Sequence, residues 1–291
     1  MKKTNIIIIA FAALSLTGCK SLYGNYERPD VKTSGIVRDP VDDKGALAGS
    51  NDFGNLPWRS VFTDPQLQTL IEKALENNPD LLNAALNIDI AEQQLRASKL
   101  AFLPSVVFAP NGSISHFGTH TSSTQAYTLP ITASWDVDLF GKLRSQKKAA
   151  QMALIQSRDY KVAVQTNLIC NVANLYYTLL MLDRQKQIVD DMSGLTKNTW
   201  DMMKLQMEFG RARSTSVQSA EAAYYSVQTQ GADIKRQIRE TENTLSLLLG
   251  EPAQSIARGS LENQSLPANF SGGIGVQLLS NRADVHANEM A

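Results

Sequence analysis

A stretch of 68 residues, from Lys142 to Phe209, contains no proline and a single glycine, Gly194. Apolar residues recur along it at steps of three and four, which is the spacing of one face of an α-helix. They are Leu168, Val172, Leu175, Leu179, Leu182 and Val189. At 1.5 Å per residue this stretch would make a helix roughly 100 Å long, far beyond the helices of ordinary globular domains. The sequence therefore predicts one very long helix.

A return helix is predicted after the turn Gly210-Arg211-Ala212-Arg213. Ser214 is a residue type that caps helix starts, and Gly250-Glu251-Pro252 ends the pattern. The apolar seam between them alternates steps of three and four, which is typical of a coiled coil. Its positions are Val217, Ala220, Tyr224, Val227, Gly231, Ile234, Ile238, Thr241, Leu245 and Leu248. Residues 141–250 thus predict a long antiparallel helical hairpin.

Two shorter helices are expected before the hairpin, within residues 58–103. Asp64-Pro65 indicates a helix start, with the aspartate as N-cap and the proline in the first turn. Asn77-Asn78-Pro79-Asp80 interrupts this helix and caps the next. The apolar positions of the two helices are Leu67, Leu70, Ile71, Ala74 and Leu75, then Leu81, Ala84, Ala85, Ile88, Ala91, Leu95 and Leu100.

The period changes to two after Pro104, so residues 104–140 predict a pair of strands. Residues 105–117 form the first candidate, 118–125 a polar loop, and the second candidate runs from Tyr127 to Asp138. One face of the second strand holds Tyr127, Leu129, Ile131, Ala133, Trp135 and Val137, and the other holds Thr128, Pro130, Thr132, Ser134, Asp136 and Asp138. Such alternation over about a dozen residues suits a tilted strand that crosses a membrane. A half-solvated strand of a soluble sheet is the alternative interpretation.

The N-terminus has the pattern of an export signal. Lys2 and Lys3 precede an apolar stretch, residues 6–16, that is too short to span a bilayer. The stretch ends in Leu16-Thr17-Gly18-Cys19, which resembles the lipobox of bacterial lipoproteins. The resemblance implies a signal peptide at 1–18, cleavage before Cys19, lipidation (palmitate) of Cys19, and outer-membrane sorting because Lys20 is not aspartate. A plain secretory signal is the alternative. Residues 19–57 then form a tether.

Composition excludes several classes of function. With 28 basic and 28 acidic residues, the chain lacks the basic excess of nucleic-acid binders. His116 and His120 stand four apart in a predicted loop, so we expect no metal site. The sequence holds no motif for a catalytic nucleophile or a phosphate loop, so we expect no catalytic residues, no cofactor and no enzyme. Cys170 lies among apolar residues and is predicted to be buried.

The end of the chain is similar in sequence to an earlier segment. After a linker at 251–274, Leu279-Ser280-Asn281-Arg282-Ala283-Asp284-Val285 parallels Leu75 to Leu81 at an offset of 204 residues. Residues 275–291 therefore predict the start of a second repeat, which at equal length would end at about residue 480. We expect the chain to be a C-terminally truncated form or fragment of such a protein.

Four stretches together resemble TolC-like outer-membrane efflux proteins, in particular their lipoprotein branch. Residues 58–67, Trp-Arg-Ser-Val-Phe-Thr-Asp-Pro-Gln-Leu, resemble that branch's opening, and 135–144, Trp-Asp-Val-Asp-Leu-Phe-Gly-Lys-Leu-Arg, its strand-to-helix junction. Gly210, Ser214, Val217 and Glu221 are placed as in its first hairpin tip. Residues 278–285 resemble the start of its second repeat, although Ala283 stands where proline is usual.

The resemblance implies a mainly α fold with a transmembrane β-strand pair. A homotrimer would build one twelve-stranded β-barrel and an α-helical tunnel across the periplasm. The tunnel would join a periplasmic adaptor (membrane fusion protein) and an inner-membrane RND-type pump, and this multidrug efflux system would export drugs and other small toxic compounds. The protein would be a passive conduit, lipid-anchored in the cell outer membrane.

The expected site residues are of two kinds. Lumen-facing residues on the strand and its junction are Thr128, Thr132, Ser134, Asp136 and Asp138, where a structural role at the junction is an equal alternative for the two aspartates. Residues of the hairpin tip that contact the adaptor are Gly210, Arg211, Arg213 and Ser214, with a solvated turn as the alternative. The other interpretation of the whole chain is a periplasmic coiled-coil lipoprotein scaffold or adaptor, which should carry soluble β-domains beside its hairpin.

Overall fold

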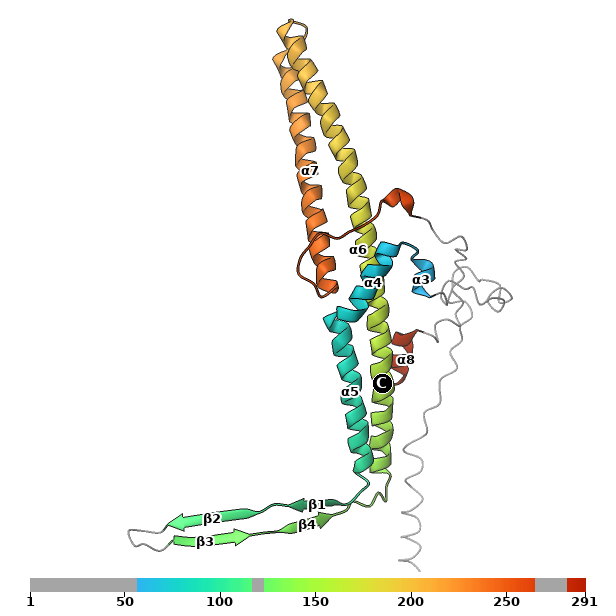
Figure 1. Ribbon diagram of the computed structural model, residues 1–291, viewed down its shortest axis with the longest axis vertical. Helices are drawn as coiled ribbons and strands as arrows, with labels where there is room; N and C mark the ends of the chain where they lie inside the picture. Colours follow the sequence, from blue (N-terminus) through green and yellow to red (C-terminus); the bar gives the residue numbers. More distant parts are fainter. Residues whose placement is uncertain (1–56, 117–122, 265–281) are drawn as a thin grey trace, which may run out of the picture. The chain divides into compact units, whose positions relative to one another are not determined.

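The computed structural model describes residues 57–116, 123–264 and 282–291, all of which belong to one unit, 44–291 (Figure 1). The predicted signal peptide, Cys19 and nearly all of the tether lie outside the described residues, as do residues 265–281, with the end of the linker and the beginning of the second repeat. None of the helices in the described ranges is long and apolar enough to cross a membrane.

The long helix is the element on which the others are placed. Helix α6, Lys142–Glu208, has 67 residues, which corresponds to roughly 100 Å and confirms the prediction. Helix α7, Ser214–Leu248, returns along its second half. Helix α5, Pro79–Leu100, packs against its first half (Figure 1). One continuous helix is therefore supported by two shorter ones in succession.

The predicted coiled-coil seam of α7 is confirmed. Each of its ten positions is buried or half-buried, and nearly all residues between them are exposed. Gly231 faces Val189, where an added Cβ would lie 3.5 Å from the valine Cγ1. The two helices therefore approach each other closely at this level.

The hydrophobic core lies where α7 ends and α5 begins. Helix α4, Pro65–Asn77, crosses α6 there and buries Leu67, Ile71 and Ala74 completely. Tyr176 and Leu179 of α6 and Leu245 of α7 are equally inaccessible and belong to the same cluster. A short helix, α3, Trp58–Val61, precedes α4, with Trp58 at the rim of the core. The core therefore lies between the half of α6 that packs against α5 and the half that packs against α7.

Asn78 and Gly250 connect the end of α7 to the start of α5. Asn78 is 3% exposed; its side-chain oxygen accepts the amides of Asp80 and Leu81 at 3.0 and 3.1 Å, and its amide nitrogen donates to the carbonyl of Leu248 at 3.0 Å. Gly250 ends α7 with φ +67°, and a Cβ there would lie 2.6 Å from the carbonyl oxygen of Asn77. The junction thus combines a helix cap with a close backbone approach.

The strand region is one antiparallel ribbon with a break in each strand. Strand β1, Ser105–Phe108, pairs with β4, Ile131–Ser134, and β2, Asn111–His116, pairs with β3, Ser123–Thr128. The same register continues across the break, where the amide of Ala109 donates to the carbonyl of Pro130 at 3.3 Å. Pro110 and Pro130 interrupt the ladders because proline has no N–H to donate.

The predicted bounds of the second strand were wrong at both ends. It starts at Ser123, inside the expected loop, because the first strand extends to His116 and offers partners there. It ends at Ser134 and not at Asp138, because β1 begins at Ser105 and leaves Trp135 to Asp138 without a partner strand. The predicted alternation of two faces is confirmed over the paired residues.

Within the described ranges, two short elements follow α7. The 3₁₀-helix η2, Leu261–Asn263, lies against α6, as does helix α8, Ala283–Glu289. His286 of α8 contacts Asp159 of α6, with Nδ1 and Oδ2 2.6 Å apart. Helix α8 therefore lies within residues 275–291, where the sequence predicts the start of a second repeat.

The prediction that Cys170 is buried was wrong. Its neighbours Leu168, Ile169, Val172 and Ala173 are buried, whereas Cys170 is exposed. Helix α6 has partners on only part of its circumference, and Cys170 lies on the open part. An apolar sequence context therefore did not decide the position of this side chain.

Candidate functional site

The hairpin tip is a short turn closed by glycine. Gly210 has φ +70°, its amide donates to the carbonyl of Met207 at 2.9 Å, and the amide of Arg211 donates to that of Gln206 at 2.8 Å. These two bonds form a Schellman motif. Ser214, which we expected to cap α7, is its first helical residue, and the capping position belongs to Arg213, whose backbone is extended.

The tip presents positive charge to solvent. Arg211 and Arg213 are both exposed, and neither forms an ion pair with another residue in the part of the chain that the structure describes. Ser214 is exposed beside them. The tip therefore offers two free guanidinium groups at the end of the long hairpin, and the role of these residues in binding an adaptor stays a prediction.

The strand ribbon has a polar face. Ser105 lies opposite Ser134, and their hydroxyls are 2.7 Å apart. Thr132 and Thr128 follow on the same side by the alternation of the strand, and Thr128 donates to the carbonyl of Asn111 at 3.4 Å. Thr128, Thr132 and Ser134 thus share one face, as predicted, and that this face lines a lumen stays a prediction.

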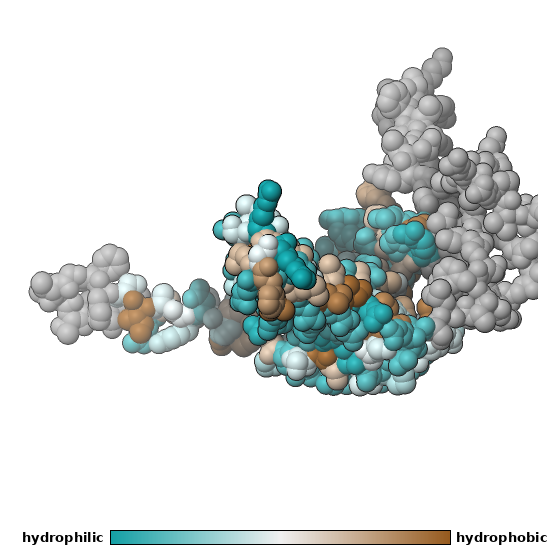
Figure 2. Space-filling model, turned by 90° about the horizontal axis from the view of Figure 1, so that it is seen from above, coloured by the Kyte–Doolittle hydropathy of each residue, from teal (hydrophilic) through white to brown (hydrophobic). Residues whose placement is uncertain are grey.

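The opposite face of the ribbon is apolar and uncovered. Large side chains on it are more than half exposed: Val106, Phe108, Ile114, Tyr127, Leu129 and Ile131. Figure 2 shows hydrophobic residues on the surface of this ribbon. An isolated two-stranded ribbon is at best marginally stable in water, so this face requires a partner or a lipid environment.

The two aspartates of the strand-to-helix junction differ in their contacts. Asp138 Oδ2 accepts the amide of Arg144 at 3.1 Å and lies 3.5 Å from its guanidinium, and its side chain is only 7% exposed. Asp138 therefore accepts an amide of the first turn of α6, where a negative charge is favoured. Asp136 is exposed. These contacts give Asp138 a structural role at the junction and leave Asp136 free to face solvent.

A second apolar stripe runs along α6 on a face that α7 does not cover. Its members recur at steps of three, four and seven and are all at least 40% exposed: Met181, Ile188, Met192, Leu195, Met202, Leu205 and Phe209. A helix normally has one stripe toward its partner and a polar opposite face. The second stripe therefore has no partner among the described residues.

Residues of the opening motif form a polar centre that sequence analysis did not foresee beyond the helix cap. Asp64 Oδ1 accepts the amide of Gln66 at 2.8 Å, as expected for an N-cap. Its Oδ2 also accepts the hydroxyl of Tyr176 at 2.6 Å and the side-chain amide of Gln264 at 2.8 Å. The amide of Gly259 donates to the Tyr176 oxygen at 3.2 Å. The centre therefore joins α4, α6 and the linker.

The comparisons with known proteins agree on one family. The family described as "Outer membrane efflux protein" matches residues 70–251, more than half of the chain. The chain belongs to the outer membrane efflux protein family.

Individual outer membrane efflux proteins match over nearly the whole chain. It is 28% identical to the "Cation efflux system protein CusC" of Escherichia coli over 285 residues, 96% of this chain and 61% of the relative. It is 28% identical to the "Probable outer membrane lipoprotein SilC" of Salmonella typhimurium over 286 residues, 93% of this chain and 59% of the relative. The chain therefore spans about three-fifths of the length of these relatives.

The fold agrees with solved channels. The open-state outer membrane channel MtrE of Neisseria gonorrhoeae matches with a TM-score of 0.71 and 25% identity, over 92% of this chain and 60% of that one. The predicted fold class, a mainly α protein with a long coiled-coil hairpin and strands of a TolC-like α/β-barrel, is thereby confirmed.

The electrostatics of the Asp64 centre predict a pH dependence. Burial raises the pKa of Asp64, but the hydrogen bonds that it accepts outweigh burial and hold its pKa below the ordinary 3.8. Burial and the bond to Asp64 raise the pKa of Tyr176 to about 12. A lowered carboxyl pKa stabilises the fold at pH above 3.8 and loses that effect as the pH falls through the folded-state value.

We therefore expect Asp64→Asn to lower the thermal midpoint by several degrees at pH 7 and by progressively less below pH 4. The midpoint of the helical circular-dichroism signal at pH 7, 5, 4 and 3 checks this. Asp89→Asn, on the exposed side of α5, removes the same charge without these contacts and serves as the control. If the difference in thermal midpoint between wild type and Asp64→Asn stays constant down to pH 3, the lowered pKa of Asp64 is contradicted.

Proposed function

We propose that the chain forms part of an outer-membrane channel, the exit duct of a tripartite efflux system. One observation carries this proposal: an apolar-faced strand ribbon is joined directly to a roughly 100 Å helical hairpin in a member of the outer membrane efflux protein family. Each strand covers twelve positions, counting the break, and about 9–11 residues suffice for a tilted strand to cross a membrane.

The channel is an assembly of several chains. The ribbon has two free edges and an uncovered apolar face, and α6 has a second exposed apolar stripe. A homotrimer with a shared twelve-stranded barrel accounts for both, because neighbouring strands would pair with the edges, lipid would cover the apolar face, and neighbouring hairpins would cover the stripe. The complete conduit is proposed for the protein in the form of its full-length relatives.

The lumen is lined by the polar face of the ribbon. Thr128, Thr132 and Ser134 would contact hydrated solutes, together with Asp136, whose carboxylate is free of other contacts among the described residues. Asp138 is less suited to line the lumen because its carboxylate accepts the amide of Arg144 in the first turn of α6. Wall polarity, tip contacts and closure are sufficient for a passive conduit, so we propose that the protein is not an enzyme and uses no cofactor.

The chain is anchored in the outer membrane and extends into the periplasm. The lipobox at Cys19 supports a lipid anchor, and the name of SilC, a probable outer membrane lipoprotein, supports the same location. At the other end, Arg211 and Arg213 would meet a periplasmic adaptor that connects to an inner-membrane RND-type pump. The exported compounds are drugs or other small toxic molecules, and the name of CusC adds cations to these classes.

The scaffold or adaptor alternative is less well supported. It predicted soluble β-domains beside the hairpin, whereas the strands beside it in the described ranges form a single ribbon with both faces exposed. The family match is to outer membrane proteins.

Removal of the full-length gene that contains this sequence is expected to raise dye accumulation in its host several-fold and to increase drug sensitivity. Restoring the gene should reverse both changes. Restoring it as Arg211→Glu/Arg213→Glu should not, because reversing two charges at the tip would repel the surface that meets the adaptor. Ethidium accumulation in cells that express the partner pump is the measurement.

A matched control separates the tip from the rest of the hairpin. Lys235→Glu/Arg239→Glu reverses two charges on the exposed flank of α7 and should restore efflux fully. Unchanged accumulation and drug sensitivity after removal of the gene would refute the channel function. Full efflux with the tip variant would refute the role of the two arginines alone.

A further inference from the structure

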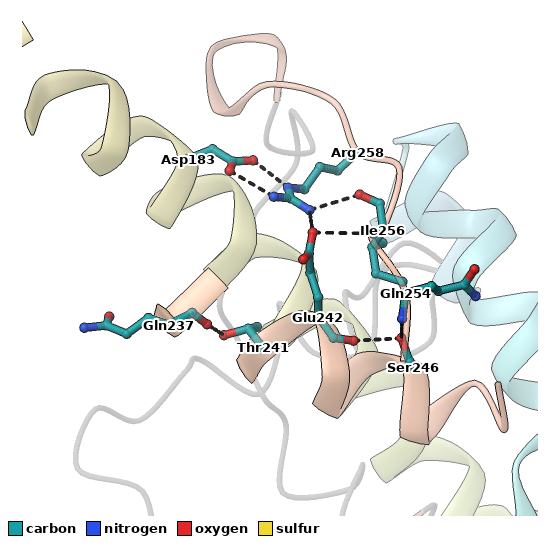
Figure 3. A network of polar contacts seen from close by, with 8 residues as sticks. All are labelled: Asp183, Gln237, Thr241, Glu242, Ser246, Gln254, Ile256 and Arg258. Carbon is teal, nitrogen blue, oxygen red and sulfur yellow. Dashed lines mark hydrogen bonds and ion pairs between the residues drawn. The ribbon is translucent and has the colours of Figure 1, made fainter. Parts of the chain in front are cut away.

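One arginine of the linker contacts both helices of the hairpin. Arg258 Nε and Nη2 donate to the two carboxylate oxygens of Asp183 on α6 at 2.5 and 2.9 Å, and Nη1 donates to Glu242 Oε1 on α7 at 2.6 Å (Figure 3). Nη1 also donates to the carbonyl of Ile256 within the linker, at 3.0 Å. A single guanidinium therefore joins three segments that are distant in the sequence.

This group is largely shielded from water. The side chains of Arg258 and Glu242 are each 13% exposed, and that of Asp183 is 35% exposed. Hydrogen bonds to Asp183 raise the pKa of Arg258 above its already high ordinary value, so the guanidinium stays charged at every pH that the protein meets. Ion pairs with this little exposure are weakly screened, and losing one partner leaves a charge that is costly to keep dehydrated.

Without Arg258 the two carboxylates would face each other across the hairpin with no cation. Two nearby cations have their own partners: Arg184 pairs with Glu262 at 3.1 Å, and Lys186 pairs with Asp190 at 2.6 Å. Arg239, one turn before Glu242 on α7, is exposed and forms no ion pair among the described residues. Two carboxylates that share a poorly hydrated space repel each other, and one of them takes up a proton more readily. The spacing of α6 and α7 at this level is therefore sensitive to the presence of the guanidinium.

At the start of the linker, the amide of Glu251 donates to the carbonyl of Ser246 at 3.0 Å. The hydrogen bonds that the linker forms with α7 between there and Arg258 are weaker. The amide of Ile256 donates to Glu242 Oε1 at 3.5 Å, and the amide of Gln254 donates to the Ser246 hydroxyl at 3.4 Å (Figure 3). Both distances lie at or beyond the usual range for such bonds. Arg258 therefore supplies the short bonds that tie the linker to both helices of the hairpin at this level. Further along, Gly259 and Gln264 bind the linker to Tyr176 and Asp64.

We propose that Arg258 is a positioning residue that couples the linker to the spacing of the hairpin helices. While it is in place, it neutralises Asp183 and Glu242 and holds α6 and α7 together at the base of the hairpin. Any movement that withdraws the linker also exposes the two carboxylates to each other and drives the helices apart. The linker thus acts as a charged clamp on the hairpin.

Arg258→Gln in the full chain, purified in detergent, tests the clamp. We expect amide hydrogen exchange of peptides that cover 252–262 to become at least about tenfold faster, while exchange at the hairpin tip stays unchanged. The thermal midpoint at pH 7.5 should fall by about 5–10 °C. Arg282→Gln, which removes an exposed arginine from a local pair with Asp284, should change neither quantity.

The pH profile distinguishes a clamp from simple loss of packing. In Arg258→Gln the midpoint should rise as the pH is lowered from 7.5 to 5, because the unpaired carboxylates bind a proton more tightly in the folded state. The wild-type midpoint should not rise. Adding Glu242→Gln to Arg258→Gln should remove this rise. It should also reverse at least half of the decrease in the thermal midpoint, although Glu242→Gln alone is destabilising.

A conservative variant covers the case in which Arg258→Gln does not fold. Arg258→Lys keeps the charge but cannot make the forked contact with Asp183, so we expect an intermediate midpoint and no rise with acid. The proposal is overturned if the profile of Arg258→Gln follows that of wild type. It is also overturned if adding Glu242→Gln to Arg258→Gln does not raise the thermal midpoint. A third contrary result is amide hydrogen exchange in Arg258→Gln that accelerates to the same degree along the whole hairpin.

Discussion

Replacing Gly250 with alanine is expected to lower the free energy of unfolding by about 3 kcal/mol or more. The left-handed backbone of Gly250, with φ +67°, costs an L-residue roughly 1–2 kcal/mol. In addition, the new Cβ would lie 2.6 Å from the carbonyl oxygen of Asn77, and overpacking of this kind costs typically about 1–3 kcal/mol. Because the obstacle is backbone, it cannot be relieved by a change of rotamer.

Gly210 provides the matched control. It ends α6 in the same way, with φ +70°, but an added Cβ would meet no atom within 4 Å. Gly210→Ala should therefore cost only the backbone term, roughly 1–2 kcal/mol. Urea unfolding followed by circular dichroism at 222 nm gives both values. Equal losses for the two variants would show that the approach of α7 to Asn77 contributes nothing to stability.

Replacing Asn78 with alanine is expected to cost about 2–4 kcal/mol. The variant loses the cap of α5, which contributes roughly 0.5–2 kcal/mol. It also leaves the carbonyl of Leu248 without the donor that now reaches it at 3.0 Å, and an unsatisfied buried acceptor costs about 1–3 kcal/mol. The same denaturation measurement tests this expectation.

Asn78→Asp separates the two contributions, since aspartate caps a helix as well as asparagine does. The aspartate oxygens can accept the amides of Asp80 and Leu81, but they cannot donate to Leu248. We therefore expect Asn78→Asp to keep the cap and to lose at least the second contribution at pH 7, because its buried carboxylate would also face the Leu248 carbonyl oxygen. A fully stable Asn78→Asp would mean that the bond to Leu248 is not needed, and a loss below about 0.5 kcal/mol for Asn78→Ala would contradict the role of Asn78 in the junction.

The parts of the fold that the sequence predicted correctly all depend on local periodicity. The absence of proline between Lys142 and Phe209 and the three–four seam of α7 predicted the hairpin, because each describes neighbouring turns of one helix. Asp64 was identified as an N-cap from its place before Pro65. The two faces of the ribbon followed from alternation along a single strand.

The errors arose where a partner segment decides the outcome. The second strand ends at Ser134 because β1 offers no partner beyond it, and no pattern within residues 127–138 carries that information. Ser214 has the residue type of a cap, but the extended backbone of Arg213 places the cap one residue earlier. Cys170 is exposed because the partners of α6 cover only part of its circumference.

The candidate site shows the same division. The tip residues Gly210, Arg211 and Arg213 and the polar face with Thr128, Thr132 and Ser134 could be found from the sequence, because turns and strand faces are local features. The clamp at Arg258 could not, since Asp183 and Glu242 lie 75 and 16 residues away from it. An arginine in a linker rich in proline, glycine and serine gives no sign of its partners.

The sequence by itself determined two building elements, a long hairpin and a strand ribbon with two different faces, and it predicts a signal peptide at residues 1–18, before Cys19. These properties depend on residues that are neighbours along the chain or one helical turn apart. Only the tertiary structure decided how the elements are joined, through Asn78 with Leu248, Gly250 with Asn77, Tyr176 with Asp64, and Arg258 with two carboxylates. Such contacts depend on which surfaces meet when α4, α7 and the linker pack on α6, and packing of distant segments leaves no periodic trace in the sequence.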